Sequence, residues 1–572
     1  MAKVLRDERI SNEVGVGVEY HIPGMGQRID IIISGRDELD RAKVVIVELK
    51  QWSEATMLPQ DGMVMTRFQH GAVPHVHPSY QAWSYAALLS GFNEAVYKKD
   101  VQLQPCAYLH NYASDDVMTN RFYAPYLERA PVFLKGDDEL AKLRSFVAHH
   151  VRTGDAGKAI YDIENGRIRP SKMLVDSLAG MMRGNPEFVL IDDQKVVFET
   201  VLAAARGASH MSKQVLIVEG GPGTGKSVLA INVLSALSKL GLNCRYVSKN
   251  AAPRTVYQRK LAGALRAVEI RNFFSGSGAF MDTDENLFDV LVVDEAHRLN
   301  VKSGLYENQG DHQIKEIIRS SRTSVFFVDD NQQVTLKDIG SRAEIEEWSQ
   351  RAGATTTRLH LASQFRCNGS DGYVAWLDNV LAVRSTANFT FDRASYDFQI
   401  FDSPTQLHES IIEKNRASNK ARMVAGYCWK WASKRDPQAF DIVLEEFDYK
   451  RRWNLASDGS GWIMAENSVE QVGCIHTSQG LEVDYVGVII GPDFVVRDGE
   501  VQTRPMERAS SDRSLRGYRS LLRAGDPHIE ARADQIIKNT YRTLMTRGMR
   551  GCYVYCTDDE TRAHFRRHLA NE

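Results

Sequence analysis

Residues 215–230 read VLIVEGGPGTGKSVLA, and this stretch decides how the rest of the chain is interpreted. Its first four residues are apolar, which favours a buried strand, and the residues after Lys226 have the spacing of a helix. Between them lies a glycine-rich loop, whose backbone N–H groups can surround phosphate oxygens at the positive end of that helix. The stretch therefore predicts a site for a nucleoside triphosphate.

The polar residues of this loop have predicted roles. Lys226 offers a mobile cation to the β- and γ-phosphates, and the Ser227 hydroxyl can ligate Mg²⁺. We therefore expect ATP and Mg²⁺ as the cofactors of this region. The other residues expected to contact the phosphates are Gly220, Gly221, Gly223, Thr224 and Gly225.

Length and composition limit the architecture. A chain of 572 residues is too long for one core, so about two to four domains are expected. The formal net charge of -2 restricts any nucleic-acid surface to a local patch. Seven scattered cysteines favour reduced thiols, and no stretch has the apolar length of a signal or a membrane span. These features predict a cytoplasmic protein without a membrane partner.

Two apolar runs near the N-terminus, residues 28–34 and 43–50, predict paired strands. Antiparallel pairing would bring Asp30 and Glu48 to the same edge of a sheet. Lys50 shares a face with Glu48, because the two residues are two positions apart. Two carboxylates that hold a metal ion beside a lysine suit hydrolysis of a phosphodiester. Mg²⁺ is the expected metal, with Mn²⁺ as an alternative.

A helix is predicted over residues 77–89, with Gln81 and Tyr85 one turn apart on one face. Together with Asp30 and the run Glu48-Leu49-Lys50, this pattern resembles the PD-(D/E)XK nuclease superfamily. The Gln81 and Tyr85 helix is similar to the extra motif of its recombination-nuclease branch.

That resemblance implies a third metal-binding acid, for which Glu13 and Glu19 are both candidates. The alternative is that this region only binds a ligand, since a strand that ends in Glu-Leu-Lys is common at protein surfaces. The residues to which the resemblance gives a catalytic role are Asp30, Glu48, Lys50, Gln81 and Tyr85.

A second strong signal lies at residues 288–297, which read FDVLVVDEAH. An apolar strand is predicted to end in two adjacent carboxylates, Asp294 and Glu295. Asp294 can bind Mg²⁺ through water, and Glu295 can accept the proton of the attacking water. Two such acids downstream of a phosphate-binding loop indicate ATP hydrolysis.

Motifs in the order of superfamily-one helicases occupy residues 194–550. Residues 244–250 resemble motif Ia, which touches a nucleic-acid backbone, and residues 324–333 resemble motif III. Residues 473–486 and 541–551 resemble motifs V and VI. Three segments are similar to sequences of the bacterial Schlafen-type DNA/RNA helicase-like family: SQFRCNGSDGYVAW, HTSQGLEVDYVGVI and NTYRTLMTRGMRGCYVY.

This resemblance implies further nucleotide contacts. Gln194 would read the adenine edge, and Gln333 would sense the γ-phosphate. Arg366 and Arg547 would reach the γ-phosphate from a second lobe, and Glu482 of motif V would also face the nucleotide. Two departures leave questions open: Asp329 replaces the usual glycine of motif III, and Gln479 stands where the recombination branch often has lysine. The polarity of translocation therefore stays open.

The sequence thus predicts an α/β chain with a PD-(D/E)XK-like nuclease domain at residues 1–155 and a linker at 156–190. Two RecA-like lobes follow at residues 191–350 and 351–572. The arginine-rich stretch near 494–530 is predicted to be an insertion or a mobile loop. It is either solvated, or it contacts a phosphate backbone or acts as a gate.

The predicted function is an ATP-dependent helicase or translocase fused to a nuclease, with DNA favoured over RNA. Defence against foreign DNA and repair are the roles that the resemblance suggests. Alternatively, the ATPase is a switch that senses nucleic acid or a partner protein and gates cleavage without unwinding. The sequence also leaves open whether the chain forms a homo-oligomer.

Overall fold

The computed structural model describes residues 1–570 apart from several short segments, and it forms two compact units. The first unit comprises Met1–Gly180 with Gly184–Ala203, and the second comprises Met181–Arg183 with Ala204–Glu572. The side chains of residues 174–176, 267–268, 371, 466 and 478 are not described either. The segments left out are 23–27, 69–70, 167–173, 184–187, 209–211, 304–308, 363–370, 387, 392, 394–395, 417, 437, 455–461, 464, 479–482 and 571–572.

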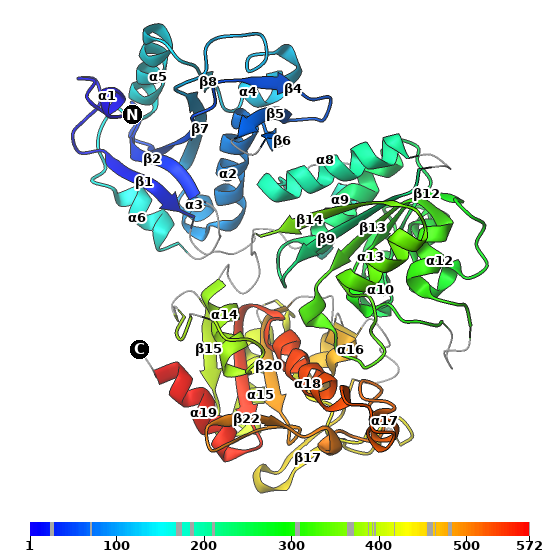
Figure 1. Ribbon diagram of the computed structural model, residues 1–572. Helices are drawn as coiled ribbons and strands as arrows, with labels where there is room; N and C mark the ends of the chain where they lie inside the picture. Colours follow the sequence, from blue (N-terminus) through cyan, green and yellow to red (C-terminus); the bar gives the residue numbers. More distant parts are fainter. Residues whose placement is uncertain are drawn as a thin grey trace. The chain divides into compact units, whose positions relative to one another are not determined.

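A five-stranded sheet in the order β1-β2-β3-β7-β8 forms the centre of the first unit (Figure 1). The pairs β1–β2 and β2–β3 are antiparallel, as predicted for the two apolar runs, whereas β3–β7 and β7–β8 are parallel. The strands span Gly15–His21 (β1), Arg28–Arg36 (β2), Ala42–Lys50 (β3), Gln102–Leu109 (β7) and Val132–Phe133 (β8).

Helices pack against this sheet. The helix α2, Pro78–Phe92, contacts β3 and β7, while α5, Asp137–His150, shares a core with alternate residues of β2 and β3. Burial on both faces explains why β3 is a continuous apolar run. The unit's other elements are α1 (Ala2–Leu5), β4 (Ala55–Met57), β5 (Met63–Phe68), β6 (Gly71–Val76), α3 (Glu94–Lys98), η1 (Arg121–Tyr123), α4 (Ala124–Leu127), α6 (Lys158–Glu164), α7 (Leu174–Arg183, which ends in the second unit) and the first part of α8 (Asp192–Gly207).

The first lobe of the second unit contains an all-parallel sheet in the order β11-β10-β12-β13-β9-β14. Its strands are β9 (Gln214–Gly220), β10 (Cys244–Val247), β11 (Phe274–Ser275), β12 (Phe288–Val293), β13 (Ser321–Val328) and β14 (Thr355–Leu361). The helices are α9 (Lys226–Lys239), α10 (Ala251–Leu261), α11 (Ala267–Phe273), η2 (Ser277–Phe280), η3 (Ala296–Arg298), α12 (Gln313–Ser320), η4 (Asp330–Gln332) and α13 (Arg342–Arg351). In a parallel sheet the carboxyl ends of the strands meet at one edge, which brings the ends of β9, β12 and β13 together.

The second lobe repeats this arrangement with the parallel order β15-β23-β20-β16-β19. Its sheet comprises β15 (Asp397–Ile400), β16 (Ala421–Ala425), β19 (Val472–Gly473), β20 (Val483–Ile490) and β23 (Gly548–Cys556). The hairpin β17 (Ile442–Leu444) and β18 (Tyr449–Arg451) lies outside that sheet. The helices are α14 (Asp371–Val380), α15 (Pro404–Arg416), η6 (Glu445–Phe447), η8 (Glu466–Glu470), α16 (Ile475–Ser478), α18 (Ile529–Met545) and α19 (Asp559–Ala570).

The arginine-rich insertion contains regular secondary structure along its described backbone. It forms the hairpin β21 (Phe494–Arg497) and β22 (Glu500–Thr503), the short turn η9 (Pro505–Glu507) and α17 (Tyr518–Arg523). One arginine of this insertion, Arg508, is buried and ion-paired with Asp493 at 2.6 Å and Asp512 at 3.0 Å. Composition alone did not reveal these pairs, although Asp512 lies only four residues further along the chain.

The predicted fold class is confirmed: the chain combines an N-terminal α/β unit with two all-parallel sheets. The search of the described residues finds no helix that is both long and apolar enough to cross a membrane.

Candidate functional site

The glycine-rich loop connects β9 to α9, as predicted. Gly223 and Gly225 have φ angles of 81° and 82°, a region in which a side chain would be strained. The ammonium of Lys226 donates hydrogen bonds to the carbonyls of Gly220 and Gly221, both at 2.6 Å. The loop is therefore curled around the lysine Nζ, with its backbone shaped by glycines where the sequence predicts phosphate contacts.

The predicted metal-binding residues Ser227 and Asp294 lie in direct contact. Ser227 donates its hydroxyl proton to Asp294 Oδ2 at 2.7 Å, and Tyr246 of β10 donates to the same oxygen at 2.6 Å. Burial, and then the neighbouring Glu295, raise the pKa of Asp294, while the two hydroxyl donors oppose this effect. A carboxylate and a hydroxyl side by side are hard oxygen donors of the kind that Mg²⁺ prefers, so the residues present fit that ion. Tyr246 was not predicted from sequence.

Glu295 follows directly and has an unusual backbone conformation. Its φ angle is 54°, which is uncommon for a residue with a side chain and is often found at functional sites. Burial favours its neutral form, but a hydrogen bond and the charge of His297, followed by Arg547 and Lys226, outweigh burial and lower its pKa. His297 Nε2 lies 3.0 Å from the carboxylate. The side chain is therefore held as an anion that can accept a proton.

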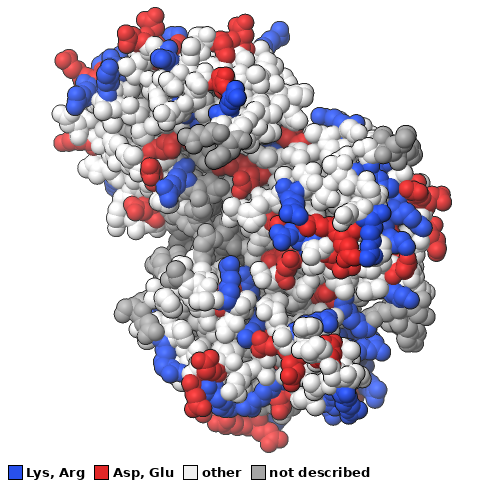
Figure 2. Space-filling view, in the orientation of Figure 1, with Lys and Arg blue, Asp and Glu red and all other residues white. Residues whose placement is uncertain are grey.

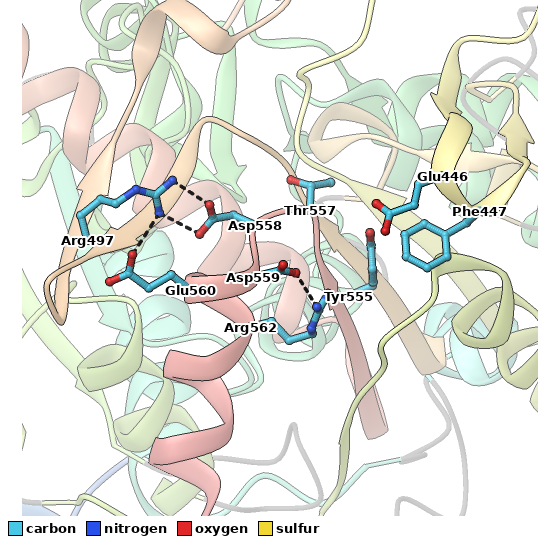
Figure 3. Close-up of a pocket in the computed structure, with 9 residues that line it drawn as sticks. All are labelled: Glu446, Phe447, Arg497, Tyr555, Thr557, Asp558, Asp559, Glu560 and Arg562. Atoms are coloured by element: carbon cyan, nitrogen blue, oxygen red, sulfur yellow. Dashed lines mark hydrogen bonds and ion pairs between the residues drawn. The ribbon is translucent and has the colours of Figure 1, made fainter.

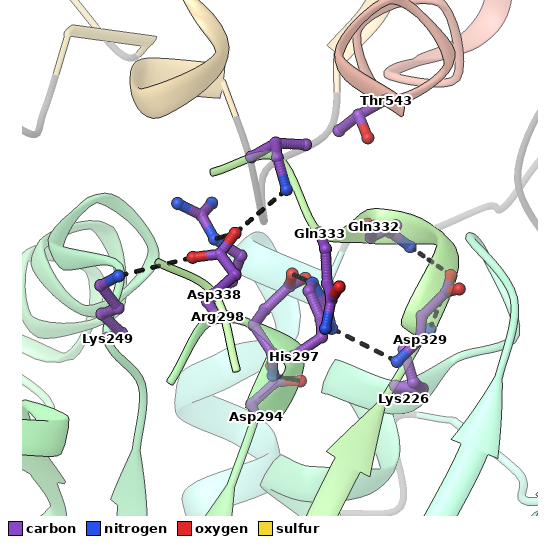
Figure 4. A network of polar contacts seen from close by, with 12 residues as sticks. Lys226, Lys249, Asp294, His297, Arg298, Asp329, Gln332, Gln333, Asp338 and Thr543 are labelled. Carbon is purple, nitrogen blue, oxygen red and sulfur yellow. Dashed lines mark hydrogen bonds and ion pairs between the residues drawn. The ribbon is translucent and has the colours of Figure 1, made fainter. Parts of the chain in front are cut away.

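A chain of polar contacts joins the loop lysine to the second lobe. Lys226 Nζ lies 4.0 Å from Asp329 Oδ2, and Gln332 donates to that same oxygen at 2.6 Å. Arg547, just before β23, donates in turn to Gln332 Oε1 at 3.3 Å. Figure 4 shows Lys226 beside Asp329 and Gln332, which follow β13. The structure thus brings Arg547 to the predicted nucleotide site through Gln332, which sequence reasoning did not single out.

One further contact links the lobes beside this chain, and an ionic cluster of the first lobe lies close to it in sequence. Asn539 of α18 donates to the backbone carbonyl of Gln333 at 3.0 Å, so this predicted sensor touches the second lobe through its backbone. Asp338 is buried and pairs with Arg298 at 2.9 Å and Lys249 at 3.5 Å (Figure 4). Of this ionic cluster, sequence reasoning had singled out only the segment of Lys249, residues 244–250, which resembles motif Ia.

For three further residues that were predicted to contact the nucleotide, we describe no distance to this site. Arg366 and Glu482 lie outside the described residues. Gln194 is buried in the first turn of α8, within the first unit. Their roles stay predictions.

The N-terminal candidate site is formed by the ends of β2 and β3. The backbone N–H of Leu49 donates to Asp30 Oδ2 at 2.7 Å, which places that carboxylate beside the end of β3. Lys50 Nζ donates to Glu48 Oε1 at 2.7 Å. The other oxygen of Glu48 is buried and has no hydrogen-bond partner among the described residues. Burial, together with Asp30 and a further acid, Asp192, raises the pKa of Glu48 to about 7, against the effect of Lys50.

Gln81 and Tyr85 are joined to this site through Asp192. Gln81 Nε2 donates to the Tyr85 hydroxyl at 2.9 Å, and Tyr85 donates to Asp192 Oδ2 at 2.7 Å. Burial, followed by the charges of Asp192 and Glu48, raises the pKa of Tyr85. Sequence reasoning missed Asp192, because it lies in α8, far along the chain from α2. Of the two acids predicted instead, Glu19 is exposed and pairs with Arg28 at 3.2 Å.

The donors fit a divalent cation at this N-terminal site, since a buried carboxylate oxygen without a partner is stabilised by a positive ion. A ready-made cluster of three or more metal-ligating side chains is absent from the part of the chain that the structure describes. Asp30 and Glu48 would therefore share a metal ion with water or substrate oxygens.

A hollow of about 470 Å³ on the second lobe lies apart from the predicted motifs (Figure 3). Four acids and two arginines line it. Arg497 forms a bidentate ion pair with Asp558, with N–O distances of 2.7 and 2.9 Å. The excess of acids makes this hollow a poor site for phosphate. The lining residues are Glu446, Phe447, Arg497, Tyr555, Thr557, Asp558, Asp559, Glu560 and Arg562.

Comparisons with known proteins agree with the geometry of the second unit. The family described as Schlafen group 3, DNA/RNA helicase domain, matches residues 213–558, which is more than half of the chain. An uncharacterized protein of Saccharomyces cerevisiae is 22% identical over 412 residues, which cover 65% of this chain and 89% of the yeast protein. The chain belongs to the Schlafen group 3 DNA/RNA helicase domain family.

Proposed function

We propose that the protein is an ATP-driven translocase or helicase, with DNA favoured over RNA as its track and a Mg²⁺-dependent nuclease in its first unit. Membership of the helicase-domain family already suggests a nucleic-acid-related ATPase. The observation that carries the proposal furthest is the chain from Lys226 through Asp329 and Gln332 to Arg547. It joins the loop lysine of one lobe to an arginine of the other, which is what coupling of hydrolysis to lobe movement requires.

In this proposal ATP binds at the glycine-rich loop, with Lys226 on its terminal phosphates. Ser227 and Asp294 would hold Mg²⁺, which neutralises phosphate charge when bound. Glu295 accepts the proton of the attacking water, and His297 keeps that carboxylate oriented. Arg547 stabilises the charge that develops on the transferred phosphoryl group.

Four predicted contacts complete the nucleotide site in this proposal. Gln194 reads adenine, Gln333 responds to the γ-phosphate, and Arg366 and Glu482 approach from the second lobe. The support for these four is the resemblance to superfamily-one helicases, not a measured contact.

Replacing Glu295 by Gln should lower strand-stimulated ATP turnover by about 10²-fold, because a neutral amide cannot accept the water proton. ATP binding should remain, since the amide keeps the shape of the side chain. Steady-state hydrolysis, with and without single-stranded DNA, measures the first effect, and a fluorescent ATP analogue measures the second. Parental turnover in this variant would refute the assignment of Glu295 as the base.

The nuclease half of the proposal is supported by Asp30, Glu48 and Lys50 at one sheet edge and by the unpartnered oxygen of Glu48. Asp30 and Glu48 would hold the metal ion, which lowers the pKa of bound water when present. Lys50 would stabilise charge on the scissile phosphate. Gln81 and Tyr85 would orient the substrate, with Asp192 fixing the Tyr85 hydroxyl. A role in defence or repair rests on the resemblance alone.

A second candidate function is a nucleotide-dependent switch that licenses cleavage without unwinding. The observation that favours it is α8, which supplies Asp192 to the first unit and whose last residues belong to the second unit. A change in the second unit could thus act on Tyr85 along one helix. Length-independent ATP hydrolysis would favour this candidate over translocation.

A further inference from the structure

Four arginines stand close together in the sequence of the second lobe. Arg513, Arg516, Arg519 and Arg523 lie in and just before α17, and all four side chains are exposed. Within the described part of the chain, no ion pair or hydrogen bond of their guanidinium groups is found. We call these four residues the arginine surface. Since the whole chain has a net charge of -2, the cluster is a local departure from a nearly neutral molecule.

The arginine surface is held on a fixed support. Leu515 and Tyr518, between the arginines, are buried in the main core of the second lobe. On its N-terminal side, Arg508 is buried between Asp493 and Asp512. Ordered backbone beneath exposed guanidinium groups reduces the entropy lost when they bind a partner.

This support is also tied to the nucleotide site. The backbone N–H of Leu336, which follows the predicted motif III, donates to the Ser514 carbonyl at 2.8 Å. The Ser514 hydroxyl lies 3.4 Å from His476 Nε2, in the predicted motif V. A partner on the arginine surface would therefore contact a segment that touches both lobes.

An aromatic and basic stretch is hydrogen-bonded to the backbone shortly before the arginine surface. Ala509 N–H donates to the Tyr427 carbonyl at 3.0 Å, and Tyr427 begins the stretch YCWKWASKR. In this stretch Trp429 and Trp431 are half-buried against the core of the lobe, and Lys434 lies over the Trp431 ring at 5.1 Å. Figure 2 shows Lys and Arg side chains gathered at the lower right, where Figure 1 draws α17.

We infer that the arginine surface binds the phosphodiester backbone of a single-stranded nucleic acid, outside the recognised helicase motifs. This inference rests on the proposed function, which supplies the nucleic acid. Planar guanidinium groups match the geometry of phosphate oxygens. Proteins that bind single strands commonly combine such basic surfaces with aromatic rings, on which the bases stack. A lipid surface fits less well, because α17 exposes only two large apolar side chains, Leu521 and Leu522, too few to insert into a bilayer.

The test compares two triple variants of the full chain. The first is Arg513→Gln, Arg516→Gln and Arg519→Gln. The matched control, Arg562→Gln, Arg566→Gln and Arg567→Gln, removes the same charge from α19, where Arg566 already pairs with Asp402 at 2.8 Å. Binding of a fluorescent single-stranded oligonucleotide is measured between about 50 and 200 mM salt.

The first variant should bind about tenfold or more weakly at 0.15 M salt, and the slope of log K against log salt should fall by about 2. The control should bind with nearly the parental slope. A variant with lysine at the same three positions keeps the charge and should retain most of the slope. If thermal melting shows that the glutamine variant is unstable, the lysine variant replaces it in the comparison.

Each other outcome has a distinct meaning. If the parent protein binds no strand of DNA or RNA, the proposed function fails. If the parent binds and the first variant binds equally with an unchanged slope, the inference about the arginine surface fails while the proposed function stands. Loss of binding to phosphatidylserine vesicles, with strand binding intact, would also overturn it.

Discussion

Replacing Arg547 by Gln is expected to lower the rate of ATP hydrolysis by about 10³-fold while ATP still binds. Arg547 is buried and donates to Gln332, and its charge lowers the pKa of Glu295. Glutamine removes the cation that would stabilise charge on the transferred phosphoryl group. It leaves the glycine-rich loop and Lys226 untouched, so the loss should appear in turnover far more than in affinity.

The matched control is Arg550→Gln, in the strand β23 that begins directly after Arg547. The Arg550 side chain is 40% exposed and pairs with Asp484 at 3.4 Å, away from the polar chain that ends at Arg547. Turnover by this control should stay within about threefold of the parent, as expected for a partly exposed ion pair. Equal losses in both variants, or near-parental turnover of Arg547→Gln, would contradict the role given to Arg547.

Replacing Lys50 by Ala is expected to lower metal-dependent cleavage of DNA by about 10²- to 10³-fold, with ATP hydrolysis unchanged. Lys50 lies 2.7 Å from Glu48 at the end of β3, where it can stabilise charge on a phosphate held near that carboxylate. Labelled linear, circular and single-stranded DNA, each incubated with Mg²⁺ and with or without ATP, give the measurement. EDTA should abolish the parental activity.

The control for this experiment is Lys98→Ala in α3, whose exposed ammonium pairs only with Glu94 on the same helix among the contacts described. It should cleave like the parent. Cleavage that persists in Lys50→Ala would point to a contaminating nuclease or a different site. No cleavage by the parent on any DNA would leave a first unit that binds rather than cuts, or one that acts on RNA.

Sequence reasoning succeeded where a residue's place follows from local structure. Ser227 and Asp294 were each predicted to bind Mg²⁺. The structure places them in contact, because the strands that precede them end at one edge of a parallel sheet. Asp30 and Glu48 were expected together because antiparallel pairing of two neighbouring runs leaves little choice of register. The fold class followed from the resemblance of the motifs to known nuclease and helicase families.

It failed where a contact depends on distant parts of the chain. Asp192 reaches Tyr85 across 107 positions, and no spacing rule predicts such a pair. Gln332 rather than Gln333 makes the side-chain contacts to Asp329 and Arg547, because the turn η4 decides which glutamine points inward. Arg508 resembled its exposed neighbours in composition, yet it is buried between two carboxylates.

The most direct test of the central claim is the number of ATP molecules hydrolysed per bound strand as the length of single-stranded DNA is increased. A translocase predicts that this number rises with length, since each step along the strand consumes nucleotide, and that Glu295→Gln abolishes the rise. ATP hydrolysis that is stimulated equally by short and long strands would contradict translocation and leave the nucleotide-dependent switch.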